Sequence, residues 1–149
     1  MEYYSNKNNE ICYYEDNNDT ICFYDLLERK VKSSISNISK CCNMIMMTKD
    51  LLLITGKNKT SIINVNNYKL LRIINVPEAS YIFGVCILNQ NMLLTGDWEN
   101  TIRQWRIEGD NLILVSKKEN AHDSWITSLV NLGNGNIVSG SFDKTIKIW

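Results

Sequence analysis

Short runs of alternating apolar and polar residues, separated by polar turns, recur along this chain of 149 residues. NMLLTG (91–96) and GNIVSG (135–140) are β-prone runs that lead to a glycine. Polar residues follow, and then TIRQW (101–105) or TIKIW (145–149), in which apolar and polar positions alternate. A period of two is typical of a half-buried strand, so each pair predicts a tight β-hairpin. Further strand-like runs lie before the hairpins (82–88, 126–132) and after hairpins (69–75, 112–116), which predicts four short strands per unit.

These units repeat about every 40 residues. SGSFDKTIKIW (139–149) aligns with TGDWENTIRQW (95–105), and residues 125–149 align with 81–105 without a gap, at an offset of 44. A step of 40 residues back gives TGKNKTSIINV (55–65), with Val65 in place of the final tryptophan. A step of 41 more gives YEDNNDTICFY (14–24), with Tyr24 there. Four-stranded units of this length are typical of propeller blades, which bury their faces by stacking on one another.

The repeat resembles the WD40 family. SGSFDKTIKIW is a close match to the end of that family's repeat, and Ala121-His122 resembles the dipeptide that opens it. The resemblance implies an all-β fold, a WD40-type β-propeller of about three and a half four-stranded blades in an incomplete ring. We expect a degenerate first blade at residues 1–35, blades at 36–75 and 76–120, and a truncated blade at 121–149.

The family resemblance also implies a structural hydrogen-bond network in the last repeat. It assigns His122, Ser139, Asp143 and Trp149 to this network, with Ser139 preferred over Ser141. A serine, a histidine and an aspartate also match the nucleophile, base and orienting acid of a hydrolase. However, the chain has no GxSxG nucleophile elbow, and buried polar groups need partners. We therefore expect a structural role for this set and no enzyme activity.

The earlier repeats keep less of the network. The 76–105 repeat has Thr95 and Trp105, but Glu99 stands in place of the aspartate and Glu78 in place of the histidine. The 36–65 repeat keeps only Thr55 at the serine or threonine position. We expect these blades to depend more on apolar packing.

The family's partners bind mainly across the narrow face of the propeller. The resemblance places contact positions just before the conserved aspartate and about three residues after the histidine. The first position holds Phe142, Trp98 and Asn58, and the second holds Trp125, Tyr81 and Cys41. Asp97, Glu99 and Asp123 are expected to lie among them. Clustered aromatic residues with a few charges are typical of interface hot spots. The alternative is that some rings plug the channel or pack between blades.

Composition narrows the classes of function. Lys and Arg together number 16, as do Asp and Glu, so the chain lacks the net positive charge typical of nucleic-acid binding. With five cysteines, no CxxC spacing and one histidine, we expect no metal site and no cofactor. No signal peptide or run of 18 apolar residues is present, which favours a cytoplasmic or nuclear location.

The leading hypothesis is a non-enzymatic scaffold or adaptor that binds other proteins or peptide segments, with no small-molecule substrate. The alternative is a structural subunit of an RNA- or ribosome-processing complex, which would need basic loops. The family closes its ring with about seven blades, within the general range for propellers. The sequence predicts about half that number, so we expect a fragment of a longer protein, an incomplete gene model, or a half-propeller that pairs with another copy.

Overall fold

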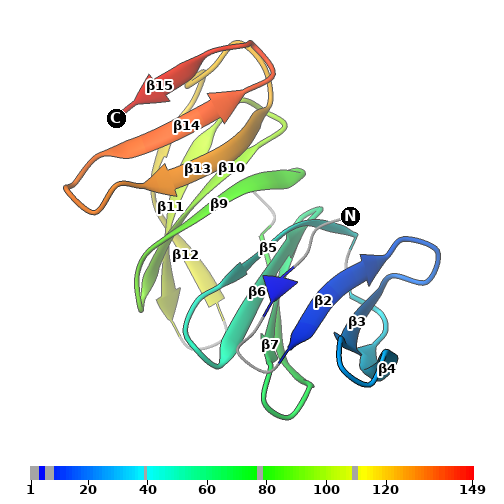
Figure 1. The fold of residues 1–149 in the computed structure, drawn as a ribbon. Helices are drawn as coiled ribbons and strands as arrows, with labels where there is room; N and C mark the ends of the chain where they lie inside the picture. Colours follow the sequence, from blue (N-terminus) through cyan, green and yellow to red (C-terminus); the bar gives the residue numbers. More distant parts are fainter. Residues whose placement is uncertain (1–3, 6–8, 39, 77–78, 109–110) are drawn as a thin grey trace.

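The computed structural model describes residues 4–5, 9–38, 40–76, 79–108 and 111–149, and these fold into four antiparallel sheets. Within each sheet, strands that follow one another in sequence pair with one another. We call the sheets blades 1 to 4. Figure 1 shows them side by side in an arc from blade 1 (blue) to blade 4 (orange and red). The predicted all-β propeller fold with an incomplete ring is confirmed for the part of the chain that the structure describes.

The strands fall within the four predicted segments, and the degenerate first segment also forms a four-stranded sheet. Blade 1 contains β1 (Tyr4–Ser5), β2 (Glu10–Glu15), β3 (Thr20–Asp25) and β4 (Lys30–Ile35). Blade 2 contains β5 (Cys41–Met46), β6 (Leu51–Gly56), β7 (Lys59–Asn64) and β8 (Lys69–Asn75). Blade 3 contains β9 (Ile82–Asn89), β10 (Met92–Asp97), β11 (Ile102–Glu108) and β12 (Asn111–Lys118). Blade 4 contains β13 (Ile126–Asn131), β14 (Ile137–Ser141) and β15 (Ile146–Ile148).

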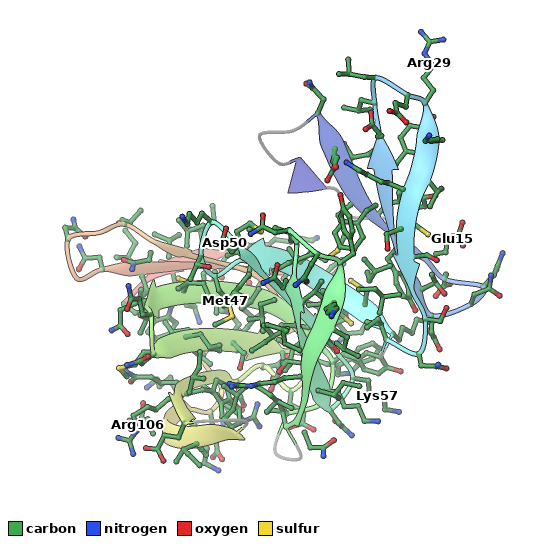
Figure 2. The ribbon with its side chains drawn as sticks, turned by 90° about the horizontal axis from the view of Figure 1, so that it is seen from below. Glu15, Arg29, Met47, Asp50, Lys57 and Arg106 are labelled. Carbon is green, nitrogen blue, oxygen red and sulfur yellow. The ribbon has the colours of Figure 1, made fainter. Side chains whose placement is uncertain are left out.

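The first strands of neighbouring blades pack together, since β9 contacts both β5 and β13. The turns that join the second and third strands all lie at one end of the blades, which we call the turn face. In blade 1 this end carries Glu15, and the opposite end carries Arg29, as Figure 2 shows. Residues before β9 and β13 also reach the turn face, because the N–H of Trp98 donates to Tyr81 O and that of Phe142 to Trp125 O, both at 3.0 Å.

Three apolar cores fill the seams between blades. Phe23 of blade 1 packs in one cluster with Leu52 of blade 2. The next residue, Leu53, belongs to the cluster shared with blade 3, and Ile126 belongs to the cluster between blades 3 and 4. Successive residues of a strand point to opposite faces, so a strand with a blade on each side is apolar at every position. This explains the uninterrupted LLLI run of β6.

The outer face of blade 4 has no blade packed on it among the described residues. Val130, Ile146 and Ile148 are 52%, 76% and 67% exposed on β13 and β15. Such exposed apolar side chains are unusual in a propeller with a closed ring, because a neighbouring blade buries each blade face there.

A recurring turn residue sets the spacing from one blade to the next. Asp19, Asn58 and Asn100 have φ angles of 47°, 54° and 62°. Asp and Asn tolerate this left-handed region better than most residues. Each carbonyl accepts a hydrogen bond of 2.8–3.0 Å from the residue ahead of the next blade, and the three donors are Ile38, Val76 and Ala121.

The strand register corrects the predicted alignment of the 36–65 repeat. Gly56 pairs with Cys41 just as Asp97 pairs with Ile82, and both pairs adjoin a bulge. The offset between blades 2 and 3 is therefore 41 at this point, and the following turn is one residue shorter in blade 2. The consequence is that the positions of Thr95 and Trp105 are filled in blade 2 by Ile54 and Ile63, not by Thr55 and Val65.

Candidate functional site

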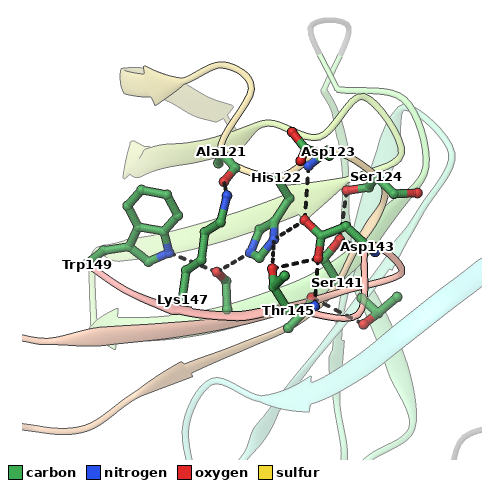
Figure 3. A network of polar contacts seen from close by, with 12 residues as sticks. Ala121, His122, Asp123, Ser124, Ser141, Asp143, Thr145, Lys147 and Trp149 are labelled. Atoms are coloured by element: carbon green, nitrogen blue, oxygen red, sulfur yellow. Dashed lines mark hydrogen bonds and ion pairs between the residues drawn. The ribbon is translucent and has the colours of Figure 1, made fainter.

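The four network residues assigned to the last repeat lie together in one hydrogen-bonded chain (Figure 3). The indole N–H of Trp149 donates to Ser139 Oγ at 2.8 Å. Ser139 Oγ lies 2.7 Å from His122 Nε2, and His122 Nδ1 lies 2.7 Å from an Asp143 carboxylate oxygen. Ser141 instead donates its hydroxyl to Ser124 O at 3.0 Å. The chain links β14, the end of β15 and the segment that leads into β13.

Asp143 braces the turn between β14 and β15. Burial raises the pKa of its carboxyl group, but hydrogen bonds from the Thr145 hydroxyl, the Asp123 N–H and His122 outweigh this and hold the pKa well below its usual range. The Thr145 N–H also donates to the carboxylate, at 2.8 Å. Hydrogen bonds donated to a carboxylate stabilise its charged form relative to the neutral acid, and this lowers the pKa.

The geometry of this set does not give Ser139 access to a substrate. Ser139 is fully buried, and its oxygen already accepts the Trp149 indole N–H. His122 is 1% exposed. A buried and fully paired polar chain stabilises a particular strand arrangement. The role of these hydrogen bonds is structural: they hold three segments of blade 4 together.

Blade 3 replaces most of this network with a buried ion pair. The Trp105 indole N–H donates to Thr95 Oγ1 at 2.8 Å, as in blade 4. Asp97 then takes over the turn, where it accepts the N–H groups of Glu99 and Thr101 and pairs with the Arg103 guanidinium group. Asp97 was expected among the exposed charges of the narrow face, and this is wrong because its side chain is fully buried. A buried carboxylate needs a charged partner, and Arg103 supplies it.

The aromatic side chains predicted for the narrow face form a continuous cluster on the turn face. The Trp98 and Trp125 rings stack with centroids 3.7 Å apart. Tyr81 lies 5.6 Å from Trp98 on one side, and Phe142 lies 5.2 Å from Trp125 on the other. Phe83 contacts the rings of Tyr81, Trp98 and Trp125. We call these five residues the aromatic face.

The aromatic face is open to solvent in part. Phe142 is 64% exposed and Trp98 is 43% exposed, whereas Tyr81 and Trp125 are half-buried. Phe83 is also half-buried, and it was missed from the sequence. It follows Tyr81 by two positions at the start of β9, so the two-residue period of a strand is the signal that could have found it.

The two polar residues assigned to this face lie differently. Asp123 is exposed, and its N–H donates to Asp143. Asn58 is exposed too, but the offset of 41 between blades 2 and 3 puts Lys57, not Asn58, at the position of Trp98. Asn58 instead serves as the positive-φ turn residue, with its N–H donating to Ser80 O at 3.1 Å.

A pocket opens at the blade 2 end of the aromatic face. Its volume is about 410 Å³, and its lining residues are Lys40, Cys41, Cys42, Tyr81, Phe83 and Trp98. A second pocket of about 600 Å³ lies between Cys41 and the β2–β3 turn of blade 1. Within the described ranges, no three His, Cys, Asp or Glu residues gather as metal ligands, and no helix is long and apolar enough to cross a membrane.

Four consecutive antiparallel sheets with apolar seams define this chain as part of a β-propeller. Residues 115–149 match the family model "WD domain, G-beta repeat". Blade 4 is thus similar to a WD40 repeat, and the four sheets together have the fold of a partial β-propeller. A search among curated proteins found no sequence match.

Similar solved structures support the same fold. One belongs to the "Crystal Structure of Mitotic Checkpoint Complex", with a TM-score of 0.76 and 13% identity. Another is the WD40 β-propeller domain of Doa1, with a TM-score of 0.76 and 19% identity. The alignments cover 95% and 97% of this chain but 46% and 47% of those chains. This chain therefore spans about half the length of the structures that it matches.

Proposed function

We propose that this chain is a non-enzymatic interaction platform that binds a segment of a partner protein across the aromatic face. WD40 propellers generally serve as scaffolds for protein interaction. The observation that carries the proposal is the unbroken contact of five aromatic rings, from Tyr81 to Phe142, with exposed rings at Trp98 and Phe142. Aromatic residues dominate interface hot spots because each buries a large area with few rotatable bonds.

The rigidity of the aromatic face supports this role. Backbone hydrogen bonds hold Trp98 and Phe142 against the residues that carry the Tyr81 and Trp125 rings. The buried Asp97–Arg103 pair and the Asp143 turn then fix the backbone just below the exposed rings. A preformed surface loses less conformational entropy when a partner binds.

Binding also fits the chemistry of this chain better than catalysis. The only Ser-His-Asp arrangement found among the described residues is the buried network of blade 4, where Ser139 is saturated by Trp149 and His122. A nucleophile needs a hydroxyl group that can reach its substrate.

The test is a pulldown from cell extract with the 149-residue protein and a Trp98→Ala/Phe142→Ala double variant. We expect the double variant to lose specifically bound proteins, because the side chains removed are the most exposed rings of the aromatic face. The matched control is Leu27→Ala/Val115→Ala, since Leu27 (75% exposed) and Val115 (47% exposed) lie away from the turn-face aromatic cluster. Retention of the same partners by a folded Trp98→Ala/Phe142→Ala variant would contradict the proposal.

A further inference from the structure

We infer that the aromatic face, if it binds as proposed above, selects an acidic peptide segment with a large apolar side chain. The apolar side chain occupies the pocket between blades 2 and 3. The carboxylates of the segment pair with Lys40, which lines that pocket, and with Lys57, which lies over the ring of Tyr81 in the pocket wall. This inference rests on the proposed function and adds the chemistry of the partner and its direction on the face.

The pocket has the form of an apolar socket with a cationic edge. Tyr81, Phe83 and Trp98 provide aromatic walls, and Cys41 and Cys42 complete the apolar lining. Its volume of about 410 Å³ lies in the range of small ligand pockets and is ample for one large side chain. A buried side chain in such a socket is the usual anchor of a peptide at an interface.

The cationic edge comes from the equivalent positions of blade 2. Lys40 precedes the Cys41–Gly56 pair as Tyr81 precedes the Ile82–Asp97 pair, and Lys57 corresponds in the same way to Trp98. Where blade 3 has two aromatic residues on the turn face, blade 2 therefore has two lysines. Both lysine side chains are exposed.

Both lysines remain open to a ligand, and Lys57 lies over an aromatic ring. Lys57 Nζ lies 5.3 Å from the centroid of the Tyr81 ring, and this ring is one of the walls of the pocket. Lys40 is 61% exposed and only 3.9 Å from Asp16, itself 73% exposed. An exposed ion pair of this length contributes little, so a carboxylate of the partner can replace Asp16 at small cost.

Charge along the aromatic face is most positive at its blade 2 end, which carries Lys40 and Lys57. Its blade 4 end carries both signs, with Asp123 and Lys144 exposed, and the exposed carboxylate of Glu99 lies in the turn of blade 3. Complementary charge favours one orientation of a bound segment and slows the association of wrong partners. We therefore expect an acidic segment to bind with its carboxylates at the blade 2 end of the aromatic face. Its large apolar residue is adjacent to these carboxylates in the peptide and enters the pocket.

The experiment measures fluorescence polarisation of a labelled peptide, Gly-Ser-Asp-Glu-Phe-Asp-Gly-Ser, with the 149-residue protein. Two matched peptides replace the acids by Asn and Gln, or the Phe by Gly. We expect the acidic peptide to bind, and to bind about tenfold more weakly to a Lys40→Glu/Lys57→Glu variant, because this variant loses two exposed charge pairs. Lys69→Glu is the control, because Lys69 is exposed at the opposite end of blade 2.

The outcomes separate this inference from the proposed function. Weaker binding of both matched peptides, together with loss of affinity in Trp98→Ala and Lys40→Glu/Lys57→Glu, supports the inference. Equal binding of the acidic and neutral peptides that still depends on Trp98 overturns the acidic selection but keeps the aromatic face. Peptide binding that is indifferent to Trp98→Ala, or the absence of saturable peptide binding to the folded protein, overturns the inference. The proposed function fails as well only if the Trp98→Ala/Phe142→Ala variant still captures the same partners. Circular dichroism checks the fold of each variant.

Discussion

The buried hydrogen bond between Trp105 and Thr95 offers the sharpest test of how blade 3 is stabilised. Thr95→Val keeps the shape of the side chain and removes the acceptor of the indole N–H, which lies 2.8 Å away. Both residues are nearly inaccessible, at 3% and 0% exposed, so water cannot replace the hydroxyl. A buried donor left without a partner costs about 1–3 kcal/mol, and we expect Thr95→Val to lower the free energy of unfolding by about 2 kcal/mol.

A double-mutant cycle with Trp105→Phe separates this bond from packing. Trp105→Phe also loses apolar contacts and leaves a cavity, but these losses occur with or without the Thr95 hydroxyl and cancel in the cycle. We expect a coupling energy of about 1 kcal/mol between the two substitutions. The measurement is urea unfolding followed by circular dichroism, because substitution of Trp105 alters the fluorescence signal.

The matched control is Thr127→Val in blade 4. Thr127 is exposed and its hydroxyl donates to Gly140 O at 3.2 Å, so water can replace that bond. Surface substitutions of this kind change stability by about 0.5 kcal/mol or less. A Thr95→Val cost no larger than that of Thr127→Val, or a coupling energy under about 0.3 kcal/mol, would refute the reasoning.

Three further predictions concern the seam, the pH dependence and the thiols. Gly96→Ala would place a Cβ atom against Ile126 Cγ2, so we expect a loss of about 2 kcal/mol in urea unfolding, and a smaller loss when Gly96→Ala is added to an Ile126→Ala variant that lacks this atom; a neutral Gly96→Ala contradicts this. The carboxyl pKa of Asp143 is lowered in the folded state, so the unfolded chain binds more protons and stability falls as the pH drops below about 4. Asp143→Asn should reduce that slope in urea unfolding, and an unchanged slope counts against the assignment. Burial and the neighbouring thiol of Cys22 raise the pKa of Cys12 to about 12, so a disulfide reagent should label Cys42 much faster than Cys12 by mass spectrometry; equal rates would show that blade 1 opens readily.

The propeller fold was predictable because its signals are local or strictly periodic. Alternation within NMLLTG and TIRQW depends only on which face of a strand is buried, and the repeat needs only an offset between similar segments. The positions of His122, Ser139 and Trp149 follow from the same offset once the family resemblance is recognised. Local patterns of this kind need no knowledge of the partner blades.

Pairing between strands decided what the offset could not. The offset between blades 2 and 3 is 41 up to the end of β6, which places Ile54 at the network position of Thr95 and Lys57 at the turn-face position of Trp98. The following turn is one residue shorter in blade 2, which places Ile63 at the position of Trp105. A one-residue change in a β-sheet exchanges the two faces, so register has to be read from the paired backbone. Sequence similarity in the polar turn was too weak to show where the residue was missing.

The amino-acid sequence by itself determined the period of the blades, their apolar cores and the types of residue available on the narrow face. Only the tertiary structure decided that Asp97 is buried against Arg103 and that Phe83 joins the rings of Trp98 and Trp125 into one surface. The physical reason is that burial and ring contact depend on how neighbouring blades approach one another. That approach is set by packing and hydrogen bonds between segments far apart in the chain.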